Sequence, residues 1–340
     1  MKNILVVFTG GTIGSTACAG VINTSEQQNF KLIQLFQQQF PTQAIQFECL
    51  QPLQILSENL HPRAWETLIA AIESQNLEQF DGIIVTHGTD TLAFTAAALS
   101  FYFHALNKPL LLVSSNYPLD DKRANGLQNF HCAVEFIRQN IQNGVFVPYQ
   151  NPQQPMHVHL GTRLASSLQL SGDFISVQSK PYLTFENNEF QFVDKTLKKA
   201  SSIDYSLCRA DFSKRILLIK PYPSLDYSAF NLEKIDAILH DLYHSGTACT
   251  TEMWGENHNL VAFLQRCRTE KVPCYLAPAL KSPDLYASSH ELEDFGAKML
   301  WNLSLEAAYV KLLFAYNTFQ EPEKIESFLQ TNLALEYLQQ

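Results

Sequence analysis

The sequence begins with a short apolar run that ends in a glycine-rich turn, Ile4-Leu5-Val6-Val7-Phe8-Thr9-Gly10-Gly11-Thr12-Ile13-Gly14. A second run of the same kind leads into Ile83-Ile84-Val85-Thr86-His87-Gly88-Thr89-Asp90-Thr91. Uninterrupted apolar runs that stop at turn residues are typical of strands buried on both faces of a parallel sheet. A third run at residues 110–114 and amphipathic segments at 62–74, 91–104 and 129–139 continue the alternation. The pattern predicts an α/β fold, with a mostly parallel sheet flanked by helices.

The length of the chain, 340 residues, suggests two domains that each bury a core. The periodic pattern weakens in a polar stretch that contains Asn187-Asn188 and Ser201-Ser202. We therefore predict a larger N-terminal domain at residues 1–185, a linker at 186–213 and a smaller C-terminal α/β domain at 214–340. In the second domain we expect strands at 216–219 and 273–276 and helices near 231–244, 259–270 and 304–316, the last capped by Ser304.

The charge balance opposes anionic partners, because 24 Lys and Arg against 33 Asp and Glu give a formal net charge of -9. We therefore expect no nucleic-acid partner and no membrane partner. The cysteines number 7 and show no C-x-x-C spacing, which favours reduced thiols over a disulfide framework or a zinc cluster. No apolar stretch of ~18 residues occurs, and the first apolar run is too short for a signal peptide. These features predict a cytoplasmic protein.

The two glycine-rich turns follow strands of one predicted sheet, at the edge where ligands of parallel sheets gather. The first turn lacks the G-x-G-x-x-G spacing and has no Lys after its last glycine, so neither a dinucleotide nor a P-loop site is indicated. It offers the backbone N–H groups of Gly10, Gly11 and Thr12 beside a hydroxyl that can attack a carbonyl, which suits acyl transfer. The alternative is that Thr12 only caps a turn. The second turn adds the carboxylate of Asp90 beside the hydroxyl of Thr89, although an Asp at a helix start is often only a cap.

Together the two turns resemble the signature segments of the bacterial-type L-asparaginase/glutaminase family, closest to its cytoplasmic type I branch. The resemblance covers nearly the whole chain, through segments such as Arg123-Ala124-Asn125-Gly126, Tyr222-Pro223, His244-Ser245-Gly246-Thr247-Ala248 and Ser304-Leu305-Glu306-Ala307-Ala308. It implies a two-domain asparaginase-like enzyme that hydrolyses the side-chain amide of asparagine to aspartate and ammonia, without a metal or organic cofactor. It also implies a homodimer or homotetramer.

The resemblance gives individual residues roles. Thr12 matches the nucleophile, which forms a β-acyl ester that water then cleaves, and Thr89 matches the second catalytic threonine. Asp90 matches the carboxylate that holds the substrate's α-ammonium group, and Ser57 falls where the family binds the α-carboxylate. The predicted substrate-binding set is Gly11, Ser57, Glu58, Gly88, Asp90 and Ser115.

Three features of the sequence depart from the family pattern. The family's lysine, which assists the second threonine, aligns with Ser166, and a serine cannot supply a cation; Ser167 or Lys180 are alternatives for a group that takes its place. Val21 stands where the family has a tyrosine that activates the nucleophile. The third strand ends in Val113-Ser114-Ser115-Asn116, where the family usually has a glycine and a glutamine.

Three interpretations remain open at this point. The chain is a working asparaginase-like amidohydrolase, a catalytically impaired amino-acid-binding or regulatory homologue, or an amidase for another amide, such as a glutaminyl group on a larger molecule. The loss of the lysine favours the second interpretation, whereas the retained threonines and Asp90 favour the other two.

The histidines add little to the predicted chemistry. We expect His87 to order its loop rather than act as a base. His157 and His159 alternate along an extended run and indicate a surface or edge strand rather than a metal pair, since no ligand set lies near them in the sequence. His244 falls in a turn that borders an effector site or a subunit contact.

Overall fold

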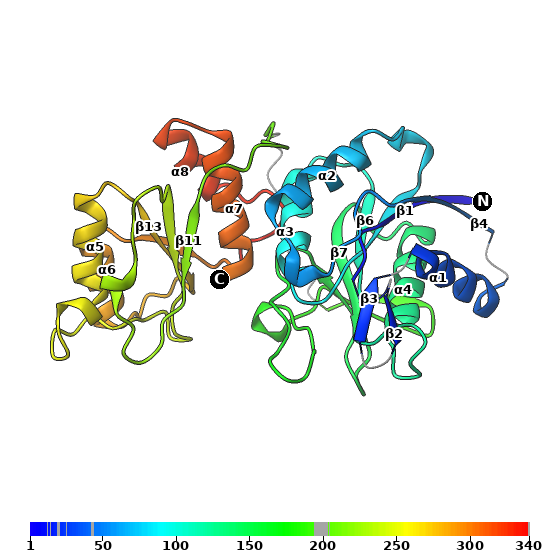
Figure 1. Cartoon of the computed structure of the whole chain (residues 1–340), viewed down its shortest axis with the longest axis horizontal. Helices are drawn as coiled ribbons and strands as arrows, with labels where there is room; N and C mark the ends of the chain where they lie inside the picture. Colours follow the sequence, from blue (N-terminus) through cyan, green and yellow to red (C-terminus); the bar gives the residue numbers. More distant parts are fainter. Residues whose placement is uncertain are drawn as a thin grey trace. The chain divides into compact units, whose positions relative to one another are not determined.

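The computed structural model describes residues 1–11, 13, 15–18, 21–24, 26–41, 44–193, 203 and 205–338. For residues 15–18, 21–24 and 26–30 it gives the backbone elements. The chain forms two compact units, Met1–Asp211 and Phe212–Gln340, each built around its own main sheet (Figure 1). The fold is mixed α/β, as the sequence predicted.

The sheet of the first unit has the order β10-β9-β8-β7-β6-β5-β1-β4. The strands from β4 to β7 run parallel, whereas β8, β9 and β10 each pair antiparallel with the strand before them. Its strands are β1 (Lys2–Phe8), β4 (Ile45–Leu50), β5 (Gly82–Thr86), β6 (Pro109–Val113), β7 (Gly144–Gln150), β8 (Met156–Leu160), β9 (Leu183–Glu186) and β10 (Glu189–Phe192). A separate hairpin joins β2 (Ser15–Cys18) to β3 (Val21–Thr24).

The central strands are apolar throughout because both faces of the sheet are covered. Every residue of β5 and β6 is buried, as the uninterrupted runs predicted. On one face α1 (Glu26–Gln39) packs against α4 (Gly126–Arg138), and on the other α2 (Pro62–Glu73) packs against α3 (Leu92–Tyr102) (Figure 1). The predicted helices in this unit are therefore present, with ends displaced by a few residues.

The predicted linker at 186–213 begins inside this sheet. Glu189–Phe192 forms β10, which pairs with β9 across a two-residue turn at Asn187 and Asn188. Both asparagines have positive φ, 51° and 63°, which is the conformation of a type I′ hairpin turn. The polar pair that suggested a linker is thus a hairpin turn. Residues 194–202 and 204 of the predicted linker lie outside the described residues.

The sheet of the second unit has the order β11-β12-β13-β14, with all neighbours parallel. Its strands are β11 (Ile216–Ile219), β12 (Ala237–His240), β13 (Cys274–Ala279) and β14 (Lys298–Trp301). The helix expected near residues 231–244 is wrong, because this segment contains β12. Its residues are all buried between β11 and β13, so burial on both faces outweighed an apparently amphipathic spacing.

The helices of the second unit are α5 (Leu260–Thr269), α6 (Ala287–Asp294), α7 (Leu305–Thr318) and α8 (Pro322–Gln330). Helix α7 packs on β11 and β13, and α8 packs on α7. Ser304 caps α7 as predicted, since its hydroxyl accepts a hydrogen bond from the Ala307 N–H at 3.1 Å. Within the described part of the chain, no helix is both long and apolar enough to cross a membrane.

Candidate active site

The two glycine-rich turns of the first unit lie side by side, because β1 and β5 are neighbouring parallel strands. Directly after these strands, the Thr9 hydroxyl donates to the Thr86 carbonyl over 2.6 Å. A third segment joins them: Ile55 donates its N–H to the Thr9 carbonyl at 2.9 Å and accepts from the Gly11 N–H at 3.0 Å. The carboxyl edge of the sheet therefore holds three chain segments in fixed register.

The first two segments touch through their glycines. Gly11 has φ +76°, and a Cβ atom there would lie 2.4 Å from the backbone nitrogen of Gly88. A Cβ on Gly88 would in turn lie 2.4 Å from the Oγ of Ser57. Contacts this short do not occur between real atoms. Gly11 is therefore required for both its positive φ and the space, and Gly88 for the space beside Ser57.

Ser57 connects the third segment to the predicted carboxylate. Its Oγ donates to Oδ2 of Asp90 at 3.0 Å and accepts from the Asp90 N–H at 3.2 Å. The Ser57 carbonyl accepts from the Thr91 hydroxyl at 2.9 Å. Ser57 is buried, whereas Asp90 is exposed. The arrangement holds one accessible carboxylate in place by a neutral hydroxyl, which leaves its charge available to a cationic group.

His87 lies buried at this sheet edge, and its imidazole ring is neutral at pH 7. Its Nδ1 donates to the Gly88 carbonyl at 2.7 Å, and the ring is buried. Burial lowers the pKa of His87 to about 4, against which the bond to Gly88 and the charge of Asp90 act only in part. A neutral imidazole that bonds to the backbone of its own loop orders that loop, as the sequence analysis expected.

Side chains that bond to the backbone hold the segment that follows β6. Ser115 is buried and donates its hydroxyl to the Tyr117 carbonyl at 2.6 Å. Asn129, on α4, donates to the Ser114 carbonyl and accepts from the Gln150 N–H, both at 2.9 Å. Ser115 thus lies at the same sheet edge, with its proton committed to the backbone.

A model of the family described as "Asparaginase, N-terminal" matches residues 3–198, more than half of the chain. The chain belongs to the asparaginase family. Two of its curated relatives are each named as a subunit of glutamyl-tRNA(Gln) amidotransferase. The one from Saccharolobus solfataricus is 26% identical over 98% of this chain and 75% of its own length. The one from Aeropyrum pernix is 27% identical over 84% of this chain and 68% of its own length.

Solved asparaginases share the fold over the full chain. The thermostable L-asparaginase from Thermococcus kodakarensis superposes with a TM-score of 0.79 at 22% identity, covering 99% of this chain and 100% of that one. L-asparaginase I from Vibrio cholerae gives a TM-score of 0.77 at 23% identity, covering 99% of each chain. The architecture of this chain is therefore the asparaginase fold.

Within this asparaginase fold, the structure brings Gly11, Ser57, Gly88 and Asp90 together, with Thr89 in the same loop. Glu58 follows Ser57, and its side chain is exposed. Thr12, the predicted nucleophile, lies outside the described residues. Ser166 follows the short bridge between Leu164 and Ser176, and Lys180 lies exposed after that bridge.

Two details of the sequence analysis need correction. The Gly11 N–H was counted among the backbone donors that the first turn offers for acyl transfer, but it is already bonded to the Ile55 carbonyl. The strand that carries His157 and His159 was expected at a surface or edge, yet β8 lies between β7 and β9, and His159 is buried. Among the described residues, no three His, Cys, Asp or Glu side chains are grouped so as to bind a metal ion.

The residues that sequence reasoning missed are Thr9, Ile55 and Thr91. Thr9 and Thr91 position the cluster through hydroxyls that donate to backbone carbonyls, and Ile55 through two backbone–backbone hydrogen bonds. Thr9 and Thr91 flank the quoted glycine turns, so their position in the motif was the available signal. Ile55 acts through its backbone alone, for which the sequence carries no signal.

Proposed function

We propose that this chain is an L-asparaginase-like amidohydrolase that releases ammonia from the side-chain amide of asparagine through a threonine acyl-enzyme. The observation that carries the proposal is the Ser57–Asp90 pair beside the touching glycines of the two turns. An accessible carboxylate at this edge suits an α-ammonium group. Membership of the asparaginase family supports the same reaction class.

In the proposed reaction Thr12 is the nucleophile. Its oxygen bonds to the amide carbon, its proton passes to the departing nitrogen, and ammonia leaves with the carbon–nitrogen bond broken. Water then cleaves the ester, which restores the threonine hydroxyl and yields the carboxylic acid. Thr89 is the second catalytic threonine, and Asp90 fixes the substrate by its ammonium group.

Ser57 has a narrower role than simple recognition of the substrate carboxylate. A serine hydroxyl has one proton, and that of Ser57 is donated to Asp90. To donate to a substrate carboxylate, Ser57 must release Asp90 at the moment when Asp90 gains the substrate ammonium as a new partner. We propose this exchange as the way in which both ends of an α-amino acid are recognised together.

A second candidate is an amidase that acts on a glutaminyl group carried by a larger molecule. It is favoured by the names of the relatives, which are subunits of a glutamyl-tRNA(Gln) amidotransferase. The exposure of Asp90 leaves room for a larger substrate. The net charge of -9 opposes direct binding of tRNA by this chain alone.

The deciding experiment measures ammonia release from asparagine, glutamine and dipeptides that carry either amide. We expect release from free asparagine that is abolished in Thr12→Ala and retained in Thr67→Ala, whose threonine is exposed on α2. Preference for the blocked glutaminyl amides would favour the second candidate. Activity that survives in Thr12→Ala would remove Thr12 from the mechanism.

Absence of ammonia from every amide, with asparagine still bound, would favour the catalytically impaired interpretation. Ser166→Lys then provides a direct test of the missing family lysine. Restoring a cation is expected to raise asparagine hydrolysis at least about tenfold, or roughly 1.4 kcal/mol of barrier. A slower enzyme would show that Ser166 is not the position of that lysine.

We also propose that the protein works as a homo-oligomer, either a dimer or a tetramer, as its family resemblance implies. Light scattering tests this directly, because the single chain has a mass of 38.5 kDa. A species of that mass alone at working concentration would contradict the proposal.

A further inference from the structure

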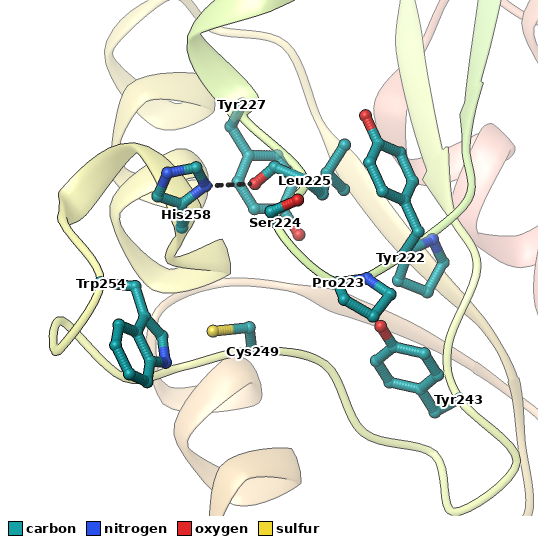
Figure 2. Close-up of a pocket in the computed structure, with 10 residues that line it drawn as sticks. Tyr222, Pro223, Ser224, Leu225, Tyr227, Tyr243, Cys249, Trp254 and His258 are labelled. Carbon is teal, nitrogen blue, oxygen red and sulfur yellow. Dashed lines mark hydrogen bonds between the residues drawn. The ribbon is translucent and has the colours of Figure 1, made fainter.

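The second unit contains a cavity of about 400 Å³ that the proposed amidase mechanism does not use. It lies beyond the carboxyl ends of β11 and β12, between the segments 221–227 and 243–258 (Figure 2). Its volume falls in the range of small-molecule sites, and this edge of a parallel sheet is where such sites form. The cavity is therefore a candidate binding site in its own right.

The walls of the cavity are predominantly aromatic. Tyr222, Tyr227, Tyr243 and Trp254 all line it, and Figure 2 shows Trp254 and Tyr243 on opposite sides. Trp254 is 71% exposed and Tyr222 is 57% exposed, although large aromatic side chains usually find cover in a folded protein. The hydroxyl of Tyr227 bonds to Nε2 of His240 at 2.8 Å, so this tyrosine presents its ring, not its hydroxyl, to the cavity.

Few polar groups point into the space. His258 Nδ1 donates to the Leu225 carbonyl at 2.8 Å, since a carbonyl can only accept. In the neutral ring, Nε2 then carries a lone pair, and the Asn257 side-chain amide lies 3.4 Å away as a donor. Ser224, Cys249 and the hydroxyls of Tyr222 and Tyr243 are the other polar side-chain groups of the lining. This set does not provide the convergent donors that a carboxylate or phosphate requires.

Among the described residues that line the cavity there is no Lys, Arg, Asp or Glu. Asp226, Glu252 and Glu256 lie in the segments 221–227 and 243–258, while Lys220 precedes the first segment and Arg266 donates to the Tyr227 carbonyl at 3.2 Å. The faces of the aromatic rings supply negative potential through their quadrupoles. The lining therefore favours a cation that needs no directional hydrogen bonds over an anion.

We propose that this cavity binds a small organic cation, a quaternary or alkylated ammonium group, against the rings of Trp254 and its tyrosine neighbours. The cation interacts with the ring faces, while its alkyl groups remove the exposed aromatic surface from water. The proposal is independent of the amidase chemistry of the first unit.

The test compares choline with 3,3-dimethylbutanol, which has the same shape without the charge. Calorimetric titration of the whole protein is expected to give a Kd for choline of ~1 mM or below. The neutral alcohol is expected to bind at least about tenfold more weakly, because it loses the cation–aromatic attraction. Equal binding of the two molecules, or no binding of choline or tetramethylammonium, would overturn the proposal, as would preference for a neutral aromatic probe such as indole.

Two variants locate the binding. Trp254→Ala removes an exposed ring and is expected to weaken choline binding about tenfold, whereas Trp254→Phe keeps most of it. Tyr286→Ala is the matched control, because Tyr286 is 63% exposed and does not line the cavity. Loss of choline binding in Tyr286→Ala but not in Trp254→Ala would place the site elsewhere and contradict the proposal.

The native cysteines supply a second measurement without any mutation. Figure 2 shows the Cys249 thiol among the residues that surround the cavity, while Cys49 is exposed on β4 of the first unit. Choline is expected to slow alkylation of Cys249 severalfold and to leave that of Cys49 unchanged. Equal rates at Cys249 with and without choline, at a concentration where calorimetry reports saturation, would show that the cation binds outside this cavity.

Discussion

The two units place chemistry at the same edge of a parallel sheet but build that edge in opposite ways. In the first unit, backbones meet at Gly11 and Gly88, and a serine hydroxyl holds the carboxylate of Asp90. In the second unit, aromatic rings surround a cavity of about 400 Å³, and the hydroxyl of Tyr227 is bonded to His240. Parallel strands fix where a site forms, and the connecting segments decide its chemistry.

The length of the connecting segment explains the difference. In the first unit β5 ends at Thr86 and α3 begins at Leu92, so only a short turn fits, and glycine is needed where it meets its neighbour. In the second unit β12 ends at His240 and α5 begins at Leu260, which leaves room for Trp254 and His258 to fold over the strand ends. A short turn favours precise polar contacts, and a long one favours a cavity.

The largest effect is expected from the buried ion pair behind the second sheet. Lys311, on α7, bonds to Glu336 at 2.6 Å, and both side chains are fully buried. Burial lowers the pKa of Lys311, while Glu336 opposes that shift. Lys311→Met leaves Glu336 buried without a counter-charge and should cost about 3–5 kcal/mol in the free energy of unfolding, measured with urea.

Lys324→Met is the control for this prediction, since Lys324 pairs with Glu321 on the surface and should change stability by less than ~1 kcal/mol. If the two variants lost equal stability, the buried pair would not support α7. Because α7 packs on β11 and β13, choline binding should be lost at a lower urea concentration in Lys311→Met than in the parent protein.

The second largest effect is expected from a substitution that changes the site in the first unit and leaves the cavity in the second unit unchanged. Gly88→Ala places a Cβ 2.4 Å from Ser57 Oγ, so Ser57 or the loop must move. Amide hydrolysis should fall at least about a hundredfold, or about 2.7 kcal/mol of barrier, as measured by ammonia release. Choline binding in the second unit should stay unchanged. An enzyme that keeps full activity would show that the close approach of the glycines is not needed for catalysis.

The two glycine-rich turns at the sheet edge of the first unit could be predicted from the sequence because the residues that identify them are adjacent in the chain. Glycine and threonine directly after apolar runs predicted both turns and their neighbourhood, and the structure brings Gly11, Gly88 and Asp90 together. The sequence could not show which acceptor each N–H and hydroxyl group of these turns bonds to. The Gly11 N–H and the Ser57 hydroxyl are both committed to partners from other segments, Ile55 and Asp90.

The second edge was beyond sequence reasoning for the opposite reason. The cavity residues come from separate segments, and Trp254 and His258 lie beyond residues 244–248, the part of their connection that carries the family resemblance. The prediction of a helix over 231–244 also hid the buried strand β12, whose carboxyl end positions Tyr243. Burial on both faces depends on neighbouring strands, and a single segment does not reveal them.

The third prediction concerns recognition at the first edge. Asp90→Asn keeps the side-chain volume but removes the charge that faces an ammonium group, so KM for asparagine should rise about tenfold to a hundredfold with a smaller change in kcat. Glu58→Gln tests the other carboxylate of the predicted binding set, and Glu78→Gln is the matched control, because Glu78 is exposed and outside that set. Equal KM values in the parent and in Asp90→Asn would contradict the assigned role, and a larger effect in Glu58→Gln would transfer that role to Glu58.

The smallest expected effect is on the pH dependence of stability, because each of the two sheet edges contains a buried histidine. Burial lowers the pKa of His87 in the first unit and of His240 in the second from 6.5 to about 4. Between pH 6.5 and pH 4 each of these histidines binds a proton in the unfolded chain but not in the folded chain. Its contribution to the free energy of unfolding is therefore fully present above pH 6.5 and declines as the pH falls toward 4. His87→Asn keeps a donor for the Gly88 carbonyl but cannot be protonated, so its loss of unfolding free energy from about pH 7 to about pH 5 should be about 1–2 kcal/mol smaller than that of the parent. His244→Asn, at an exposed position, should follow the parent curve. If the His87→Asn curve instead coincided with that of the parent, acid sensitivity would arise from other groups, and the neutral state of His87 would not be what couples the first edge to pH.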